Sequence, residues 1–220
     1  MDKREQEVAG MAELQIVAVV PREKRRVSIR FENGIEVILY RSELRGLPLR
    51  ESNLLMQEGS YVPEVLYQKI LNEIVGKRAK KRALFLLEKM DRTEYQLYDK
   101  LRQNGYPIEC VTAAIEYVKS YHYIDDLRYA RTYVRYHQQK KSRQRLKMDL
   151  IQKGVAKPTI EQALEEEFAS DEREKIKELL EKRRYDAARA DARERQRVYQ
   201  FLLRRGYKSS DILGVMRMIY

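Results

Sequence analysis

The amino-acid sequence predicts a mainly α protein in which three tandem three-helix repeats follow a small antiparallel β patch. Two observations support this. The first sixty residues contain β-branched and alternating apolar segments, whereas a glycine with four apolar positions around it recurs three times in the rest of the chain. A chain of 220 residues can form one large domain or two or three small ones with a buried core. The expected parts are residues 1–60 for the strands and 61–122, 123–168 and 169–220 for the helical repeats.

The strands are predicted between residues 14 and 41. Leu14–Val20 is a β-branched run ended by Pro21, and residues 25–41 alternate apolar and polar side chains around a turn. A two-residue loop would pair Phe31 with Glu36 and spoil the apolar face. A three-residue loop, Glu32-Asn33-Gly34, instead pairs Phe31 with Ile35, Ile29 with Val37, and Val27 with Leu39. We therefore expect a three-stranded patch with a left-handed Gly34, too small to be stable alone and packed on a helix.

From Tyr61 onward the pattern is helical, and a repeat is registered on Gly105, Gly154 and Gly206. Four apolar positions recur around each glycine. Eight before it are Leu97, Leu146 and Val198; four before it are Leu101, Leu150 and Leu202; six after it are Val111, Ile160 and Ile212; ten after it are Ile115, Leu164 and Met216. A spacing of four places each pair on one helix face, and a glycine after the last leucine is typical of a left-handed C-cap. Each unit is thus helix, glycine cap, turn, helix.

A further helix is expected before each of these pairs, over residues 65–90, 126–139 and 171–185. Pro107 and Pro158 interrupt the helical pattern only where a helix could begin. Three tandem three-helix units follow from this pattern.

The composition favours an anionic partner and a reducing compartment. The formal net charge of +11 suits nucleic acid or an anionic protein surface, and a charged content of 36% suits exposed helices. No apolar run approaches the roughly 20 residues that span a bilayer, and MDKREQEVAG lacks the apolar core of a secretory signal. Cys110 is the only cysteine, which excludes an internal disulfide and a thiolate zinc cage. We expect a cytoplasmic protein without membrane contact.

Asp125 and Asp126, in the stretch YHYIDDLRYARTYVRYHQQKK, allow two interpretations. They are either helix caps or a metal-binding or general-base pair. Adjacent helical residues point about 100° apart, so one ion would need ligands from elsewhere. His122 and His137 do not stand at ligand spacing with them. We favour capping by both aspartates, with Gly105, Gly154 and Gly206 as the C-terminal caps, and expect neither a catalytic nor a metal site.

The helix that follows carries tyrosines and arginines on different faces. Tyr129, Tyr133 and Tyr136 are expected to face the core, with nucleic-acid base stacking as the alternative. Eight Lys or Arg residues and no acid lie between Leu127 and Met148, and single-sign charge of this density favours an anionic partner. The predicted partner or DNA-binding residues here are Arg128, Arg131, Arg135, Lys140, Lys141, Arg143, Arg145 and Lys147.

A second basic cluster occupies residues 77–82 and adds Lys77, Arg78 and Lys81 to the candidate surface, whereas residues 165–178 are mostly acidic. Signatures of enzymes are missing: there is no phosphate-binding loop, dinucleotide-binding glycine motif or nucleophile elbow. Cys110 is expected on the apolar face of a helix as a structural thiol. We expect no enzymatic activity and no cofactor.

The segment YIDDLRYARTYV, followed by KKSRQRLKMDLIQKGV and TIEQAL, resembles the central signature of RecX regulatory proteins. That signature has an aromatic or leucine followed by two aspartates, an aromatic-Ala pair, an Arg-rich turn and Leu-x-x-Lys-Gly. DRTEYQLYDKLRQNGY is similar to the first repeat of the family. The likeness covers about residues 65–168, whereas the DAARADARERQR lead-in to the last repeat does not match.

This resemblance implies a non-enzymatic regulator of the RecA recombinase in DNA repair, recombination and the SOS response. It implies an elongated, curved body of helical repeats that binds the RecA–DNA filament along its groove and inhibits ATP hydrolysis, strand exchange and filament growth. Direct binding of single- or double-stranded DNA and a monomeric state are also expected. The alternative is a DNA-binding protein that acts without a recombinase through the same basic surface. A metal-dependent nuclease using Asp125 and Asp126 is the third and weakest hypothesis.

Overall fold

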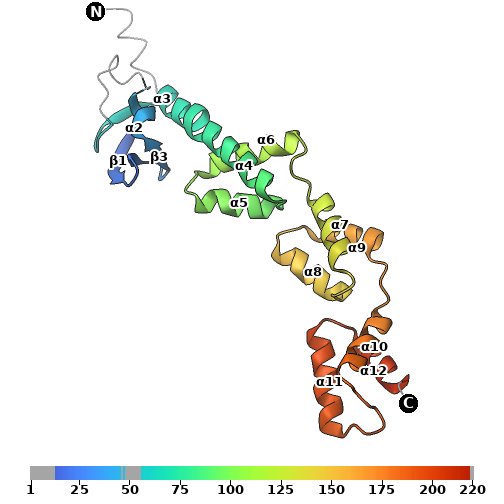
Figure 1. Ribbon diagram of the computed structural model, residues 1–220. Helices are drawn as coiled ribbons and strands as arrows, with labels where there is room; N and C mark the ends of the chain where they lie inside the picture. The colour runs from blue at the N-terminus through green and yellow to red at the C-terminus, as the bar shows by residue number, and fades with distance from the viewer. Residues whose placement is uncertain (1–12, 46, 48–55, 219–220) are drawn as a thin grey trace, which may run out of the picture. The chain divides into compact units, whose positions relative to one another are not determined.

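The structure is a computed structural model that describes residues 13–45, 47 and 56–218 (Figure 1). The chain divides into two compact units. The first unit comprises Met1–Arg92 and Gln96–Ile124, and the second comprises Thr93–Tyr95 and Asp125–Tyr220.

The first unit contains a four-stranded antiparallel sheet in the order β3-β2-β1-β4. Its strands are β1 (Glu13–Arg22), β2 (Arg26–Phe31), β3 (Glu36–Tyr40) and β4 (Tyr61–Pro63). The predicted hairpin register is confirmed, because Ile29 pairs with Val37 and Val27 with Leu39. The amide of Phe31 donates to the Ile35 carbonyl at 2.9 Å, and Gly34 has the expected positive φ of 80°.

The prediction of three strands, the first ended by Pro21, with helix from Tyr61 onward, was wrong in two respects. Tyr61–Pro63 forms β4 on the edge of β1, and β1 itself continues through Pro21 to Arg22. A three-residue strand is too short to show a period of two, so only its pairing with Glu13–Gln15 reveals it. Proline is tolerated in β1 because β4 covers only the other end of the strand and leaves this end an edge.

The helices of the first unit share one buried cluster with this sheet (Figure 1). They are α2 (Arg41–Arg45), α3 (Glu64–Lys69), the π-helical segment η1 (Ile70–Gly76), α4 (Lys77–Lys89), α5 (Glu94–Gln103) and α6 (Ile108–Ser120). Helix α5 begins in the second unit at Glu94 and continues in the first. The chain runs without interruption from α3 through η1 into α4, where the sequence predicts one helix over residues 65–90. Phe31 and Leu39 of the sheet share one buried cluster with Ile70 and Leu97. The sheet is therefore stabilised by the helices, as its small size requires.

The second unit consists of two three-helix repeats. The second repeat has α7 (Asp126–His137), α8 (Arg143–Gln152) and α9 (Lys157–Glu167), and the third has α10 (Glu172–Lys182), α11 (Ala192–Arg204) and α12 (Ser209–Met218). Each has a buried cluster, around Leu146 and Leu150 in one and Ile176 and Leu202 in the other. The predicted fold class, mainly helical with a small strand patch, is confirmed. Within the described residues, no helix is long and apolar enough to cross a membrane.

Candidate partner and nucleic-acid interface

Asp125 and Asp126 cap two different helices. The Asp125 carboxylate accepts hydrogen bonds from the backbone amides of Leu127 at 2.9 Å and Arg128 at 3.0 Å, where α7 begins. The Asp126 carboxylate accepts from the amide of Glu94 at 2.9 Å, where α5 begins. The two carboxylates therefore satisfy amides that a helix leaves without intrahelical partners. Sequence reasoning could not find the second role, because Glu94 lies 32 residues earlier in the chain.

The same arrangement recurs at the start of the third repeat. Asp171 accepts from the amides of Arg173 at 2.8 Å and Glu174 at 3.4 Å, and so caps α10. Glu172 accepts from the amide of Arg143 at 2.9 Å, at the start of α8. Each acidic pair thus caps the helix that it begins and a helix of the preceding repeat.

A hydroxyl group completes each of these connections. Thr93 donates to the Lys153 carbonyl at 2.5 Å, and Ser142 donates to the Arg205 carbonyl at 2.7 Å. Both hydroxyl residues are buried, and both stand 12 positions before a repeat glycine. We call these connections the first joint (Thr93, Glu94, Asp126 and Lys153) and the second joint (Ser142, Arg143, Glu172 and Arg205). The joints hold successive segments of the second unit together.

Two observations concern metal binding and cysteine chemistry in the described residues. No group of three or more His, Cys, Asp or Glu residues in the described ranges could hold a metal ion. Cys110 is 3% exposed and its thiol lies 3.4 Å from the Leu71 carbonyl. Burial raises the pKa of this thiol to about 11, so it is protonated at neutral pH and a poor nucleophile.

The arginines of α7 lie opposite the glutamates of α9. Arg131 forms an ion pair with Glu166, and Arg135 donates to both carboxylate oxygens of Glu167 at 2.7 and 2.9 Å. These hydrogen bonds lower the pKa values of both glutamates, chiefly through Arg131 for Glu166 and Arg135 for Glu167. Arg128 is exposed on the same helix. The arginines of α7 are thus partly neutralised by glutamates of α9. The sequence did not reveal this pairing because the paired residues lie 35 and 32 positions apart in the chain.

Two cations of α8 also have acidic partners. Lys147 forms an ion pair with Glu161, and Arg143 lies 3.6 Å from the same carboxylate while donating to the Leu164 carbonyl at 3.2 Å. These two cations therefore tie α8 to α9.

The remaining predicted cations of the second repeat converge with two that were not predicted. Together they line a cavity of about 320 Å³, which we call the basic pocket. Its lining residues are Lys140, Lys141, Ser142, Arg145, Arg204, Arg205 and Tyr207. Sequence reasoning missed Arg204 and Arg205, which lie about sixty residues from the others. Their signal was the Arg-Arg pair before Gly206, the glycine that ends α11.

The basic cluster of residues 77–82 divides into a structural and an exposed part. Arg78 donates to Glu43 at 2.9 and 3.0 Å and to the Ile38 carbonyl, and its guanidinium lies 5.1 Å from the centre of the Tyr40 ring. Arg78 therefore fastens the sheet to α4. Lys77 and Lys81 are exposed on the same helix.

The prediction that all three tyrosines of α7 face inward was wrong for Tyr136, which is 77% exposed. The buried residues of this helix are Ala130 and Val134, and Tyr136 follows Val134 by two positions, about 200° around the axis. Tyr129 and Tyr133 are half-buried, with ring centres 6.4 Å apart. Tyr133 also bonds to Asp149 at 3.1 Å.

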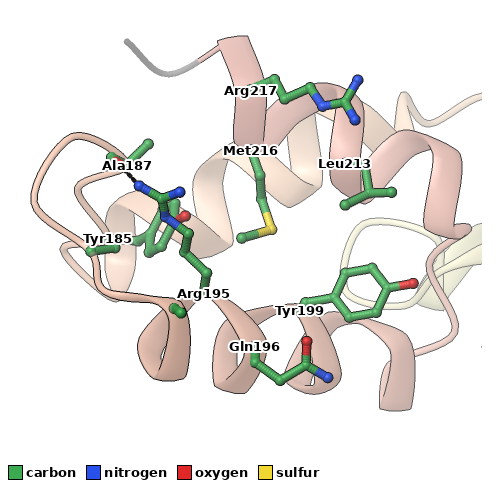
Figure 2. Close-up of a pocket in the computed structure, with 10 residues that line it drawn as sticks. Tyr185, Ala187, Arg195, Gln196, Tyr199, Leu213, Met216 and Arg217 are labelled. Carbon is green, nitrogen blue, oxygen red and sulfur yellow. Dashed lines mark hydrogen bonds between the residues drawn. The ribbon is translucent and has the colours of Figure 1, made fainter.

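A second cavity, of about 560 Å³, lies within the third repeat (Figure 2). Figure 2 shows Leu213 and Met216 pointing from α12 toward Tyr199 and Gln196 on α11. Arg195 at its edge donates to the Ala187 carbonyl at 3.1 Å. The residues that line this cavity include no acid and no histidine.

Comparisons with known proteins identify the repeats. Three family models match the chain: the RecX first three-helix domain at residues 79–117, the second at 125–164 and the third at 171–216. The third match includes the lead-in that showed no likeness by inspection.

Curated relatives and a solved structure agree with these matches. The chain is 32% identical over 159 residues to the regulatory protein RecX of Caldanaerobacter subterraneus subsp. tengcongensis, covering 71% of this chain and 78% of that protein. It is 34% identical to the regulatory protein RecX of Vibrio campbellii, covering 67% and 94%. A crystal structure of a regulatory protein RecX superimposes with a TM-score of 0.60 at 26% identity, covering 92% of this chain and 98% of that one.

Proposed function

Because the chain belongs to the RecX family, we propose that it is a non-enzymatic regulator that binds a RecA-type recombinase filament on DNA and inhibits recombinase activity. One observation carries this proposal: three RecX three-helix domains follow one another between residues 79 and 216. The relatives that it matches over most of their length are named regulatory proteins.

The charge of the chain suits such a partner. A nucleoprotein filament presents a dense array of phosphates, and the net charge of +11 promotes association with it. The proposed surface includes the predicted cations Arg128, Arg131 and Arg135. Two of these arginines are ion-paired, Arg131 with the exposed Glu166 and Arg135 with the half-buried Glu167. Surface ion pairs of this kind contribute little to stability, so exchanging them for phosphate contacts costs little.

The decisive experiment measures ATP hydrolysis by RecA on single-stranded DNA with increasing amounts of this protein. We expect the steady-state rate to fall and then level off, and the protein to sediment with the filaments. An unchanged rate at saturating concentration, together with no co-sedimentation, would overturn the proposal.

A DNA-binding protein that acts without a recombinase is the second candidate, and the basic pocket favours it. The two candidates differ in salt dependence. Binding to naked single-stranded DNA weakens with a log–log slope of about −0.7 per neutralised phosphate. Inhibition of RecA should persist at a salt concentration that abolishes binding to naked DNA. Inhibition that disappears at the same salt concentration would favour the second candidate, because the protein would then compete only for DNA.

A further inference from the structure

Every charged side chain that lines the basic pocket is a cation. Lys140, Lys141 and Arg145 come from the second repeat, and Arg204 and Arg205 come from the end of α11 in the third. Among the described residues, Lys140 and Arg204 have no carboxylate partner. Arg205 lies 4.4 Å from the centre of the Phe201 ring, and one carboxylate, Asp149, serves both Lys141 and Arg145. Five positive charges thus face one cavity, with a single acid behind them.

The second joint holds this pocket in shape. Ser142 bonds the Arg205 carbonyl at the end of α11, and a Cβ atom on Gly206 would lie 2.8 Å from the Ser142 hydroxyl. The buried Lys175 donates to the carbonyls of Gln138 and Lys141, which fixes the loop that carries Lys140. The cations are therefore brought together by contacts that do not depend on them.

The first joint shows that this architecture does not require the cations. It has the same hydroxyl-to-carbonyl bond and a glycine in the same place. Counted from the repeat glycines, however, the residues equivalent to the five cations are Asp91, Arg92, Gln96, Gln152 and Lys153. In the sequence, two cations and one acid give these five equivalent positions a total charge of +1, against +5 for the five cations of the basic pocket. The hydroxyl-to-carbonyl contact therefore forms without this excess of positive charge. We infer that the cations of the second joint serve to bind an anionic ligand.

The amides at the start of α8 are already satisfied. Glu172 accepts from the amide of Arg143, and the Ser142 hydroxyl accepts from the amide of Arg145 at 3.1 Å. A ligand in the pocket is therefore recognised by the lysine and arginine side chains, and not by the end of the helix.

We propose that the basic pocket binds a backbone phosphate group of a nucleic-acid strand. The choice of ligand rests on the proposed function, because the strand would be the DNA of the filament. A phosphate presents acceptor oxygens in several directions, so cations from two different elements can reach it. A carboxylate, by contrast, is planar and is satisfied by a single arginine fork. The arrangement of five cations on two sides of the pocket suits the phosphate.

The first test measures binding of a fluorescein-labelled oligodeoxythymidine to the full chain by fluorescence anisotropy. The pocket variant is R145Q/R204Q, which introduces the residues found at the equivalent positions of the preceding repeats, Gln96 and Gln152. The control is R189Q/R193Q, which removes the same charge from exposed positions of the third repeat. We expect the pocket variant to bind about fivefold to tenfold more weakly, with a salt slope smaller by about 0.7, and the control to change less than about twofold. Equal binding by the two variants would overturn the proposal.

A second test uses the unmodified chain and so does not depend on the folding of a variant. The rate of acetylation of Lys140 is followed by mass spectrometry with and without oligodeoxythymidine, and the exposed Lys182 of α10 is the reference. We expect the oligonucleotide to slow acetylation of Lys140 severalfold more than that of Lys182. Equal protection of the two lysines at saturation would contradict the proposal.

The outcomes separate this proposal from the proposed function. If the unmodified chain binds DNA through the pocket but leaves RecA unaffected, the regulatory function fails and the phosphate site stands. If the chain inhibits RecA and the pocket variant does so equally, with unchanged DNA binding, only the phosphate site fails. A variant that loses filament binding but keeps naked-DNA binding would show that the pocket holds an acidic protein surface, which also contradicts the proposal.

Discussion

Asp149 is a buried acid that organises two cations of the basic pocket. Its carboxylate lies 2.7 Å from the Lys141 ammonium and 3.0 Å from the Arg145 guanidinium, and it accepts a hydrogen bond from the Tyr133 hydroxyl. Burial by itself raises the pKa of this carboxyl, but the hydrogen bonds from Lys141 and Tyr133 outweigh burial and lower it. One side chain therefore links the core of the second repeat to its charged surface.

Replacing Asp149 with asparagine should destabilise the second unit in a pH-dependent way. At pH 7 we expect a loss of about 1–3 kcal/mol, because the variant leaves Tyr133 and Lys141 without their charged acceptor. The folded-state pKa of Asp149 lies below its ordinary value of 3.8, so the unfolded chain binds the proton more readily. The stabilisation is therefore present above about pH 5 and lost as the pH falls through the folded-state pKa.

Urea unfolding of both proteins at pH 7 and near pH 3 measures this effect. The difference in unfolding free energy between them should shrink at the lower pH, while the other carboxyl groups contribute equally to both. A difference that is the same at both pH values would show that the Asp149 charge does not contribute to stability.

At the scale of elements, the joints show how one helix end meets another. The repeat glycines have φ values of 82–84°, as their capping role requires. Two of them also meet another segment closely. A Cβ atom on Gly154 would lie 2.2 Å from Tyr95, and one on Gly206 would lie 2.8 Å from Ser142. These glycines thus serve both the backbone conformation and the close approach of neighbouring elements.

Gly206→Ala should therefore lower the free energy of unfolding by more than the strain of its positive φ alone explains. Gly34 is the matched control, because its φ of 80° is similar and nothing lies within 4 Å of its missing Cβ. We expect Gly34→Ala to destabilise its unit by about 1–2 kcal/mol and Gly206→Ala to cost at least about 1 kcal/mol more. Chemical denaturation, with hydrogen exchange to follow each unit, measures both losses.

The steric part of this loss can be isolated with Ser142→Ala. Removing the hydroxyl relieves the closest contact, so Gly206→Ala should cost less in the Ser142→Ala background than in the unmodified chain. Strictly additive losses would show that the joint does not depend on this close approach.

The sequence predicts local features of these elements well. The hairpin register follows from keeping Phe31, Ile29 and Val27 on one apolar face, and the structure has that register. The second and third helices of each repeat follow from the spacing of apolar residues around the glycines. Strand β4 could not be predicted, because three residues carry no period and only the edge of β1 gives them a partner.

Features of the candidate site were harder to predict because they join distant parts of the chain. The pairing of Arg131 with Glu166 spans 35 residues, and Ser142 bonds a carbonyl 63 residues later. The same charge run therefore contains cations neutralised by α9 and cations left in the basic pocket. Sequence spacing within a single helix cannot separate these two groups.

At the scale of the whole molecule, stability is divided between two compact units. The sheet and the first repeat share one buried cluster, whereas the second and third repeats have clusters of their own. The second joint connects the two repeats of the second unit through hydrogen bonds, and the two repeats have separate apolar clusters. The basic pocket belongs entirely to the second unit.

Loss of packing in the first unit should therefore leave the pocket intact. Phe31 is fully buried, with its ring centre 4.9 Å from that of Tyr67, and Phe31→Ala should cost about 3–5 kcal/mol. Leu150, fully buried in the second repeat, is the matched site, where Leu150→Ala should cost about 2–5 kcal/mol. Hydrogen exchange should show lost protection in α6 for the first variant and in α9 for the second.

Because the cations of the pocket lie in the second unit, the Phe31→Ala variant should keep its affinity for oligodeoxythymidine and the Leu150→Ala variant should lose it. Lost protection in both units on either substitution would show instead that the chain folds as one cooperative body, and DNA binding would then follow global stability rather than the second unit.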